Sequence, residues 1–84
     1  MTANDIRAVL QDELGRIAPE IDFDSLDARA DLREEADIDS MDFLNLLTAL
    51  HVRLHVDIPE ADNAKLITVQ GAIDYLTAKL AATA

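Results

Sequence analysis

A single serine and its neighbours are the part of this sequence that could do chemistry. Ser40 follows Asp39 in the segment Asp-Ile-Asp-Ser-Met-Asp at residues 37–42, and leucines at helical spacing come next. The first turn of a helix offers free backbone N–H groups and the positive end of the helix dipole, which both favour a phosphate. The carboxylates of Asp39 and Asp42 would also offer contacts to a basic or metal-dependent enzyme. The pattern predicts that Ser40 is a site of covalent modification.

Ser40 is not expected to act as a catalytic nucleophile. Such a serine needs a histidine or lysine base within reach and a third group that orients the base. The two histidines, His51 and His55, lie further along the same predicted helix. At 1.5 Å per residue, His51 is roughly 16 Å from Ser40 along the helix axis. We therefore exclude a serine hydrolase and predict no catalytic residues.

Two other groups of residues partly resemble metal sites. His51 and His55 are four residues apart and could bind a metal ion from one helix face, but no third ligand is evident. A calcium loop built on the acids of residues 22–27 is excluded, because no glycine stands at its turn and Arg33 stands where a bidentate glutamate is needed. We predict no metal site.

The charge balance narrows the possible partners. The 84 residues include 17 acidic and 7 basic side chains, which gives a net charge of −10. Nucleic acids and anionic membrane surfaces need basic side chains, so we expect neither as a partner. We expect basic surfaces of other proteins instead. No cysteine is present, no run of apolar residues could span a bilayer, and polar residues interrupt the N-terminus where a signal peptide would be apolar. These features predict a cytoplasmic protein.

The pattern of apolar residues predicts helices throughout a single domain of residues 1–84. Apolar residues recur at helical spacing, and with two glycines and two prolines few breaks are expected. Asp39 is a suitable N-cap for the helix that starts at Ser40, and Pro59 is suited to open a short helix. The predicted order is a helix at about 4–17, a long loop at 18–39, and helices at 40–55, about 60–64 and 68–80. The fold class is all-α: a small four-helix bundle of three long helices and one short third helix.

Motifs along most of the chain resemble the acyl carrier proteins. The signature of that family is Asp-Ser-Leu at the start of the second helix, and Asp39-Ser40-Met41 stands in that place. An Ile-Pro pair at residues 58–59 resembles the entry to the family's short third helix. A Thr-Val-Gln run at residues 68–70 resembles the start of its last helix. The resemblance covers roughly residues 3–80.

The resemblance implies a carrier and not a catalyst. It implies that a phosphopantetheinyl transferase uses coenzyme A and Mg²⁺ to attach 4′-phosphopantetheine to Ser40, with Asp39 and Met41 completing the attachment site. Acyl intermediates would then be carried as thioesters in fatty-acid, lipid or secondary-metabolite biosynthesis. Further partners would be an acyl- or aminoacyl-loading ligase and downstream transferases or synthases. The resemblance also implies a monomer. Its docking residues for partner enzymes would lie just before and after Ser40. These are Asp37, Asp42, Phe43 and Asn45.

Several positions depart from the common pattern of the family. Asp37 stands where a glycine is usual, three residues before the serine, and glycine permits backbone angles that aspartate tolerates less easily. Residues 40–56 hold one acid and one base, whereas residues 22–39 hold eight acids and two bases. In fatty-acid carriers, glutamates on the second helix dock onto basic patches. We therefore predict a specialised carrier with dedicated partners.

Other interpretations remain open at this point. Asp-Ser-Met is also similar to carriers of amino acids, such as D-alanyl carrier proteins, so the cargo could be aminoacyl. A different class is a helical interaction module that docks a partner through Phe43. A third is a carrier fold that has lost its modification and serves as a scaffold. Substitution of Ser40 by alanine separates these classes, because it inactivates a carrier and leaves an adaptor unaffected.

Overall fold

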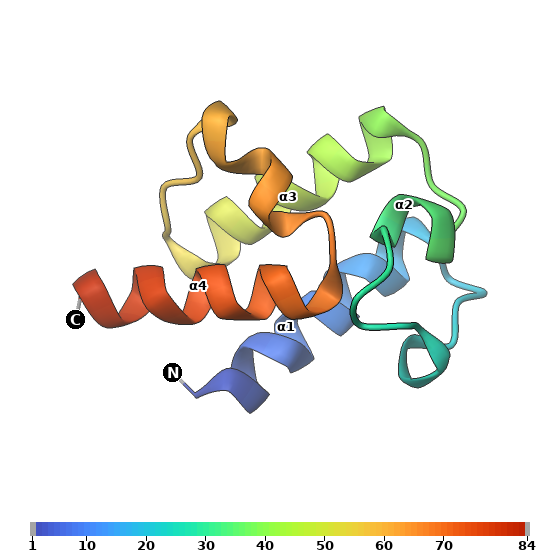
Figure 1. Ribbon diagram of the computed structural model, residues 1–84, viewed down its shortest axis with the longest axis horizontal. Coiled ribbons are helices and arrows are strands. Elements are labelled where there is room, and N and C mark those ends of the chain that lie inside the picture. The colour runs from blue at the N-terminus through green and yellow to red at the C-terminus, as the bar shows by residue number, and fades with distance from the viewer. Residues whose placement is uncertain (1, 84) are drawn as a thin grey trace.

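Three helices of 15 residues each form the frame of the molecule, and shorter helical segments connect them (Figure 1). The computed structural model describes residues 2–83, so Met1 and Ala84 of the predicted domain lie outside the described residues. Within residues 2–83 there is no strand. The all-α bundle predicted from the sequence is confirmed. Its elements in order are α1 (Ala3–Ile17), η1 (Phe23–Ser25), α2 (Leu32–Glu35), α3 (Ser40–Leu54), η2 (Glu60–Leu66) and α4 (Val69–Thr83).

Side-chain caps fix where the three long helices begin. Thr2 and Asp5 form a capping box at the start of α1, as each side chain accepts a hydrogen bond from the other residue's backbone N–H. Asp39 caps α3 by accepting from the N–H of Asp42 at 2.8 Å. Thr68 does the same before α4, where its Oγ1 accepts from the N–H of Gly71 at 2.9 Å. Each cap satisfies an N–H group that has no partner within its helix.

A core built largely of leucine, isoleucine and valine holds the helices together. α1 packs against both α3 and α4, and η2 packs against α4. Burial of these apolar side chains is the main favourable contribution to folding. The largest side chains below 2% exposure are Ile6, Leu10, Leu14, Leu32, Leu46, Leu50, Val56, Leu66 and Leu76.

The segment predicted as a long loop at 18–39 contains two short helices, η1 and α2. It closes one end of the bundle, at the right of Figure 1. Two backbone hydrogen bonds join it to the start of α4: the N–H of Leu32 donates to the carbonyl of Ile67 at 2.7 Å, and the N–H of Gln70 donates to the carbonyl of Ala28 at 2.9 Å. Phe23 and Leu32 anchor the segment in the core. This segment is therefore ordered, because contacts with residues far away in the sequence hold it against the end of the bundle.

The bounds of α3, η2 and α4 also differ from those predicted. α3 ends at Leu54 because His55 takes the left-handed conformation, with φ of 55°. η2 is a 3₁₀ helix that continues to Leu66, whose side chain is buried. α4 begins one residue later than expected and runs to Thr83.

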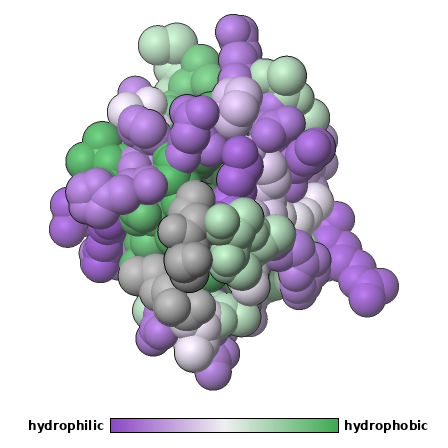
Figure 2. Space-filling view, turned by 90° about the vertical axis from the view of Figure 1, so that its left-hand side faces the viewer, coloured by the Kyte–Doolittle hydropathy of each residue, from purple (hydrophilic) through white to green (hydrophobic). Residues whose placement is uncertain are grey.

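Hydrophilic side chains dominate the face at the left of Figure 1, around a smaller apolar area (Figure 2). No helix within residues 2–83 is long and apolar enough to cross a membrane.

Candidate modification site at the start of α3

Ser40 is the first residue of α3, and its side chain is exposed. The preceding Asp39 is committed to capping, since its Oδ1 accepts from Asp42. Within residues 2–83, no protein group accepts a hydrogen bond from the backbone N–H of Ser40 or Met41. The exposed hydroxyl therefore lies beside two free donors and the positive end of a 15-residue helix. This arrangement suits an attached phosphate.

The turn that leads into Ser40 is set by the end of α2. Asp37 has φ of 52°, in the left-handed region. Its N–H donates to the carbonyl of Glu34 at 3.3 Å, and the N–H of Ile38 donates to the carbonyl of Arg33 at 3.0 Å. This pair of bonds is a Schellman motif, which ends a helix with a left-handed residue and most often uses glycine there. Aspartate reaches the same conformation here and brings a carboxylate to the turn.

The other predicted site residues divide between the surface and the core. Met41 is 66% exposed, Asn45 and Asp37 are exposed, and Asp42 is half-buried. Phe43 is 5% exposed and belongs to the hydrophobic core. The prediction that Phe43 docks a partner is therefore corrected, because its ring is packed inside the bundle. Its place in the leucine-rich face of α3 already favoured the core.

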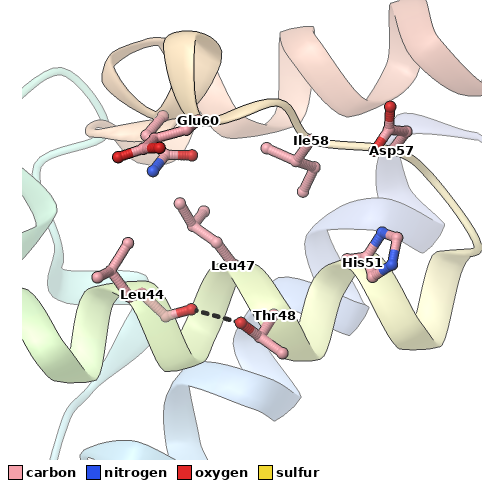
Figure 3. Close-up of a pocket in the computed structure, with 8 residues that line it drawn as sticks. Leu44, Leu47, Thr48, His51, Asp57, Ile58 and Glu60 are labelled. Carbon is pink, nitrogen blue, oxygen red and sulfur yellow. Dashed lines mark hydrogen bonds between the residues drawn. The ribbon is translucent and has the colours of Figure 1, made fainter.

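A groove begins one turn after Ser40, between α3 and the segment that leads into η2 (Figure 3). We call it the α3–η2 groove, and its volume is about 470 Å³. Leu47 and Ile58 project into it from opposite sides (Figure 3). Residues on the α3 side recur at helical spacing, which places them along one face with Ser40. The lining residues are Leu44, Leu47, Thr48, His51, Asp57, Ile58, Glu60 and Asn63.

Several of these lining residues were not predicted as part of a site. Thr48 and His51 follow Ser40 at 8 and 11 residues, so the spacing of one helix face was a signal that could have found them. Asp57, Glu60 and Asn63 join the site through the fold, and no local pattern marks them. The hydroxyl of Thr48 donates to the carbonyl of Leu44 at 3.0 Å (Figure 3). Its hydrogen bond is thus satisfied within α3.

The wall of the groove formed by η2 is fixed by a contact with α4. The hydroxyl of Tyr75 donates to Oδ2 of Asp62 at 2.6 Å. Burial raises the pKa of Tyr75 to about 12, with the neighbouring carboxylate adding to the effect. The same hydrogen bond lowers the pKa of Asp62, and Lys65 lowers it further. Asp62 precedes Asn63 of the groove, so this contact holds the groove wall in place.

The two histidines do not converge on a common ligand. His51 Nδ1 lies 2.5 Å from the carbonyl oxygen of Val56, so this ring nitrogen is engaged at the end of α3. His55 is the left-handed residue that ends the helix. In the described part of the chain, no three histidine, aspartate or glutamate side chains are placed to hold a metal ion.

Comparisons with known proteins agree with this geometry. A family profile described as "Phosphopantetheine attachment site" matches residues 4–76. The chain is 31% identical over 75 residues to an acyl carrier protein of Campylobacter jejuni subsp. doylei, an alignment that covers 89% of this chain and 91% of that protein. It is also 31% identical over 77 residues to an acyl carrier protein of Thermosynechococcus vestitus, which covers 92% of this chain and 89% of that protein.

Proposed function

Since the chain belongs to the acyl carrier protein family, with 4′-phosphopantetheine as its covalent prosthetic group, we propose that Ser40 bears this group. The observation that carries the proposal is the position of Ser40. It is an exposed hydroxyl at the start of a long helix, beside the free N–H groups of Ser40 and Met41. Those donors suit the phosphate that would join the group to the serine.

The chemistry at Ser40 belongs to partner enzymes. Proteins of this family are carriers rather than catalysts. His51 lies 11 residues after Ser40 on the same helix, roughly 16 Å away along the axis at 1.5 Å per residue, so it is not a base for Ser40. A phosphopantetheinyl transferase would supply the base and would use coenzyme A and Mg²⁺. Asp39 holds the first turn in shape through its cap, and Met41 lies exposed where the transferase would approach.

The residues around the site fit the attached group. When bound, 4′-phosphopantetheine supplies a terminal thiol on which an acyl group is carried as a thioester. Leu44, Leu47 and Ile58 line the α3–η2 groove and give it apolar walls. Those walls would shelter an acyl chain from water by burying its apolar surface. Tethering to Ser40 would hold the cargo at a high effective concentration near each partner enzyme.

We further propose that the protein serves a biosynthetic pathway in the cytoplasm through dedicated partners. Residues 40–56, which include α3, carry no net charge, whereas residues 22–39 hold eight acids and two bases. An enzyme that recognises acidic side chains on the helix after the serine would find few of them here. Turnover by a fatty-acid ketosynthase, measured beside a housekeeping carrier of the same host, tests this part. Equal rates would contradict it.

The attachment itself is tested by loading the purified protein. The apo protein is incubated with coenzyme A, Mg²⁺ and a broad-specificity phosphopantetheinyl transferase, beside a Ser40→Ala variant. The intact mass of the parent should rise by one phosphopantetheine, and the mass of the variant should not change. A gain in both proteins would place the group on another residue. No gain in either protein would contradict the proposal if the protein from its native host is also unmodified.

A further inference from the structure

A second groove lies near Ser40, between the end of α1 and the turn that joins α2 to α3. We call it the α1–α2 groove, and its volume is about 490 Å³. It reaches α3 at Asp42, two residues after Ser40. Any enzyme that acts at Ser40 must therefore come close to it. The lining residues are Ile17, Ala18, Pro19, Glu20, Ile21, Glu35, Ala36, Asp37, Ile38 and Asp42.

The floor of this groove is apolar. Ile17, Ile21 and Ile38 are partly buried and pack against the hydrophobic core. Their remaining surface, together with Ala18 and Pro19, faces the groove. Such a surface accepts the aliphatic part of a side chain that enters from a partner.

Four carboxylates surround the apolar floor: Glu20, Glu35, Asp37 and Asp42. None of them takes part in the six ion pairs found within residues 2–83. Glu35 accepts a hydrogen bond from the N–H of Asp27 at 2.7 Å. No three acidic side chains in the described residues are grouped to hold one metal ion. Separate carboxylates around an apolar floor suit separate cationic side chains better than one small cation.

The exposed face of α3 offers no comparable charge. All three large hydrophobic side chains that are exposed in the described residues lie on this helix: Met41, Leu44 and Val52. Its basic residue Arg53 is paired with Asp12 and Glu13 of α1. Its acidic residue Asp42 belongs to the α1–α2 groove. The groove therefore offers charge that a partner could recognise close to Ser40, in addition to the capping carboxylate of Asp39.

We propose that the enzyme which modifies Ser40 docks lysine or arginine side chains into the α1–α2 groove. Their aliphatic stems lie on Ile17, Ile21 and Ile38, and their charged ends reach the four carboxylates. Complementary charge steers the encounter and fixes the orientation in which Ser40 is presented. This inference rests on the function proposed above, because it concerns a partner of the same site.

Binding of a broad-specificity phosphopantetheinyl transferase tests the inference. The full chain carries Ser40→Ala, so that docking is measured without modification. Glu20→Gln with Asp37→Asn neutralises two groove carboxylates, and asparagine keeps the left-handed conformation accessible at position 37. The matched control is Asp24→Asn with Asp74→Asn, which changes the net charge equally at exposed positions outside the groove. Thermal unfolding of each variant shows whether the fold is intact.

The groove variant should raise the Kd about five- to tenfold and weaken its dependence on salt, and the control should change it less than about twofold. Equal weakening in both variants would overturn the inference, since net charge would then explain it. No weakening in the groove variant, or no binding by the parent chain, would also overturn it. If the chain with Ser40 intact binds but gains no phosphopantetheine, and the protein from its native host is also unmodified, the proposed function fails and the docking result still decides the groove.

Discussion

Arg53 of α3 donates a hydrogen bond of 3.0 Å from Nη1 to Oε1 of Glu13 on α1. Glu13 is 7% exposed and is the one buried charged residue among those described. The same nitrogen also contacts Asp12, and this hydrogen bond lowers the pKa of Asp12. The basic residue near the end of α3 thus pairs with two acids of α1 and joins the two helices.

Substitution of Arg53 by alanine should destabilise the fold, because it leaves the buried Glu13 carboxylate unpaired. Arg16→Ala is the control, because it also removes a partner of Asp12 but at the surface. The Arg16 side chain is 70% exposed, and its Nη2 lies 3.6 Å from Oδ2 of Asp12. Urea unfolding should show a midpoint that falls several times more for Arg53→Ala than for Arg16→Ala. Equal midpoints for the two variants would mean that the buried pair is unimportant.

The left-handed residue before Ser40 gives a second prediction. Asp37→Gly should raise the free energy of unfolding by about 0.5–1 kcal/mol, because glycine has no Cβ to strain this conformation. Asp37→Val should lower it, since a β-branched residue is strongly disfavoured there. Chemical denaturation measures both changes. Equal free energies of unfolding for the valine and glycine variants would contradict the left-handed conformation of residue 37.

The two glycines should respond in opposite ways to alanine. A Cβ at Gly71 would lie 2.6 Å from the backbone oxygen of Lys65 and 2.8 Å from Oγ1 of Thr68, so something must shift. Gly71→Ala should cost about 1–3 kcal/mol, as is usual for overpacking. Gly15 has nothing within 4 Å of such an atom. Gly15→Ala should add up to about 1 kcal/mol through its helix propensity. Thermal unfolding compares them, and two changes of the same sign would contradict the packing at the start of α4.

The contact between Tyr75 and Asp62 predicts a dependence on pH. The pKa of Asp62 is below its ordinary 3.8 in the folded protein, chiefly because of the Tyr75 hydrogen bond. Its contribution to stability is therefore fully present above about pH 4 and is lost as the pH falls through the folded pKa. In Tyr75→Phe, the Asp62 pKa should rise toward its ordinary value. A carboxyl titration followed by NMR measures it, and an unchanged pKa would show that the hydrogen bond does not hold the carboxylate.

The long helices were predictable because their signals are local. The leucine spacing of α3 and the cap at Asp39 lie within a few residues of each other, and both agree with the structure. α2 also had a local signal, since Asp31 precedes Leu-Arg-Glu-Glu and its side chain accepts from the N–H of Arg33. That helix of four residues is too short to form without tertiary contacts, however. Its hydrogen bond to Ile67 joins residues far apart in sequence.

The position of the candidate serine in the fold was predictable from the sequence, and the groove beside it was less so. Ser40, Asp39 and Met41 lie where the motif places them, at the start of α3. Phe43 was predicted to dock a partner but is buried, because exposure depends on which side of α3 faces α1 and the core. The groove residues Asp57 and Asn63 meet α3 only because the chain turns back after Leu54; Asp57 lies in the segment that leads into η2, and Asn63 lies in η2 itself. Spacing along one helix does not contain that information.

Peptide mass spectrometry of the protein from its native host would show which residue bears the prosthetic group. Trypsin cleaves after Arg33 and Arg53 and releases residues 34–53, in which Ser40 and Thr48 are the hydroxyl-bearing residues. Fragmentation of this peptide should place 4′-phosphopantetheine on Ser40. An unmodified peptide, or a group on Thr48, would contradict the account.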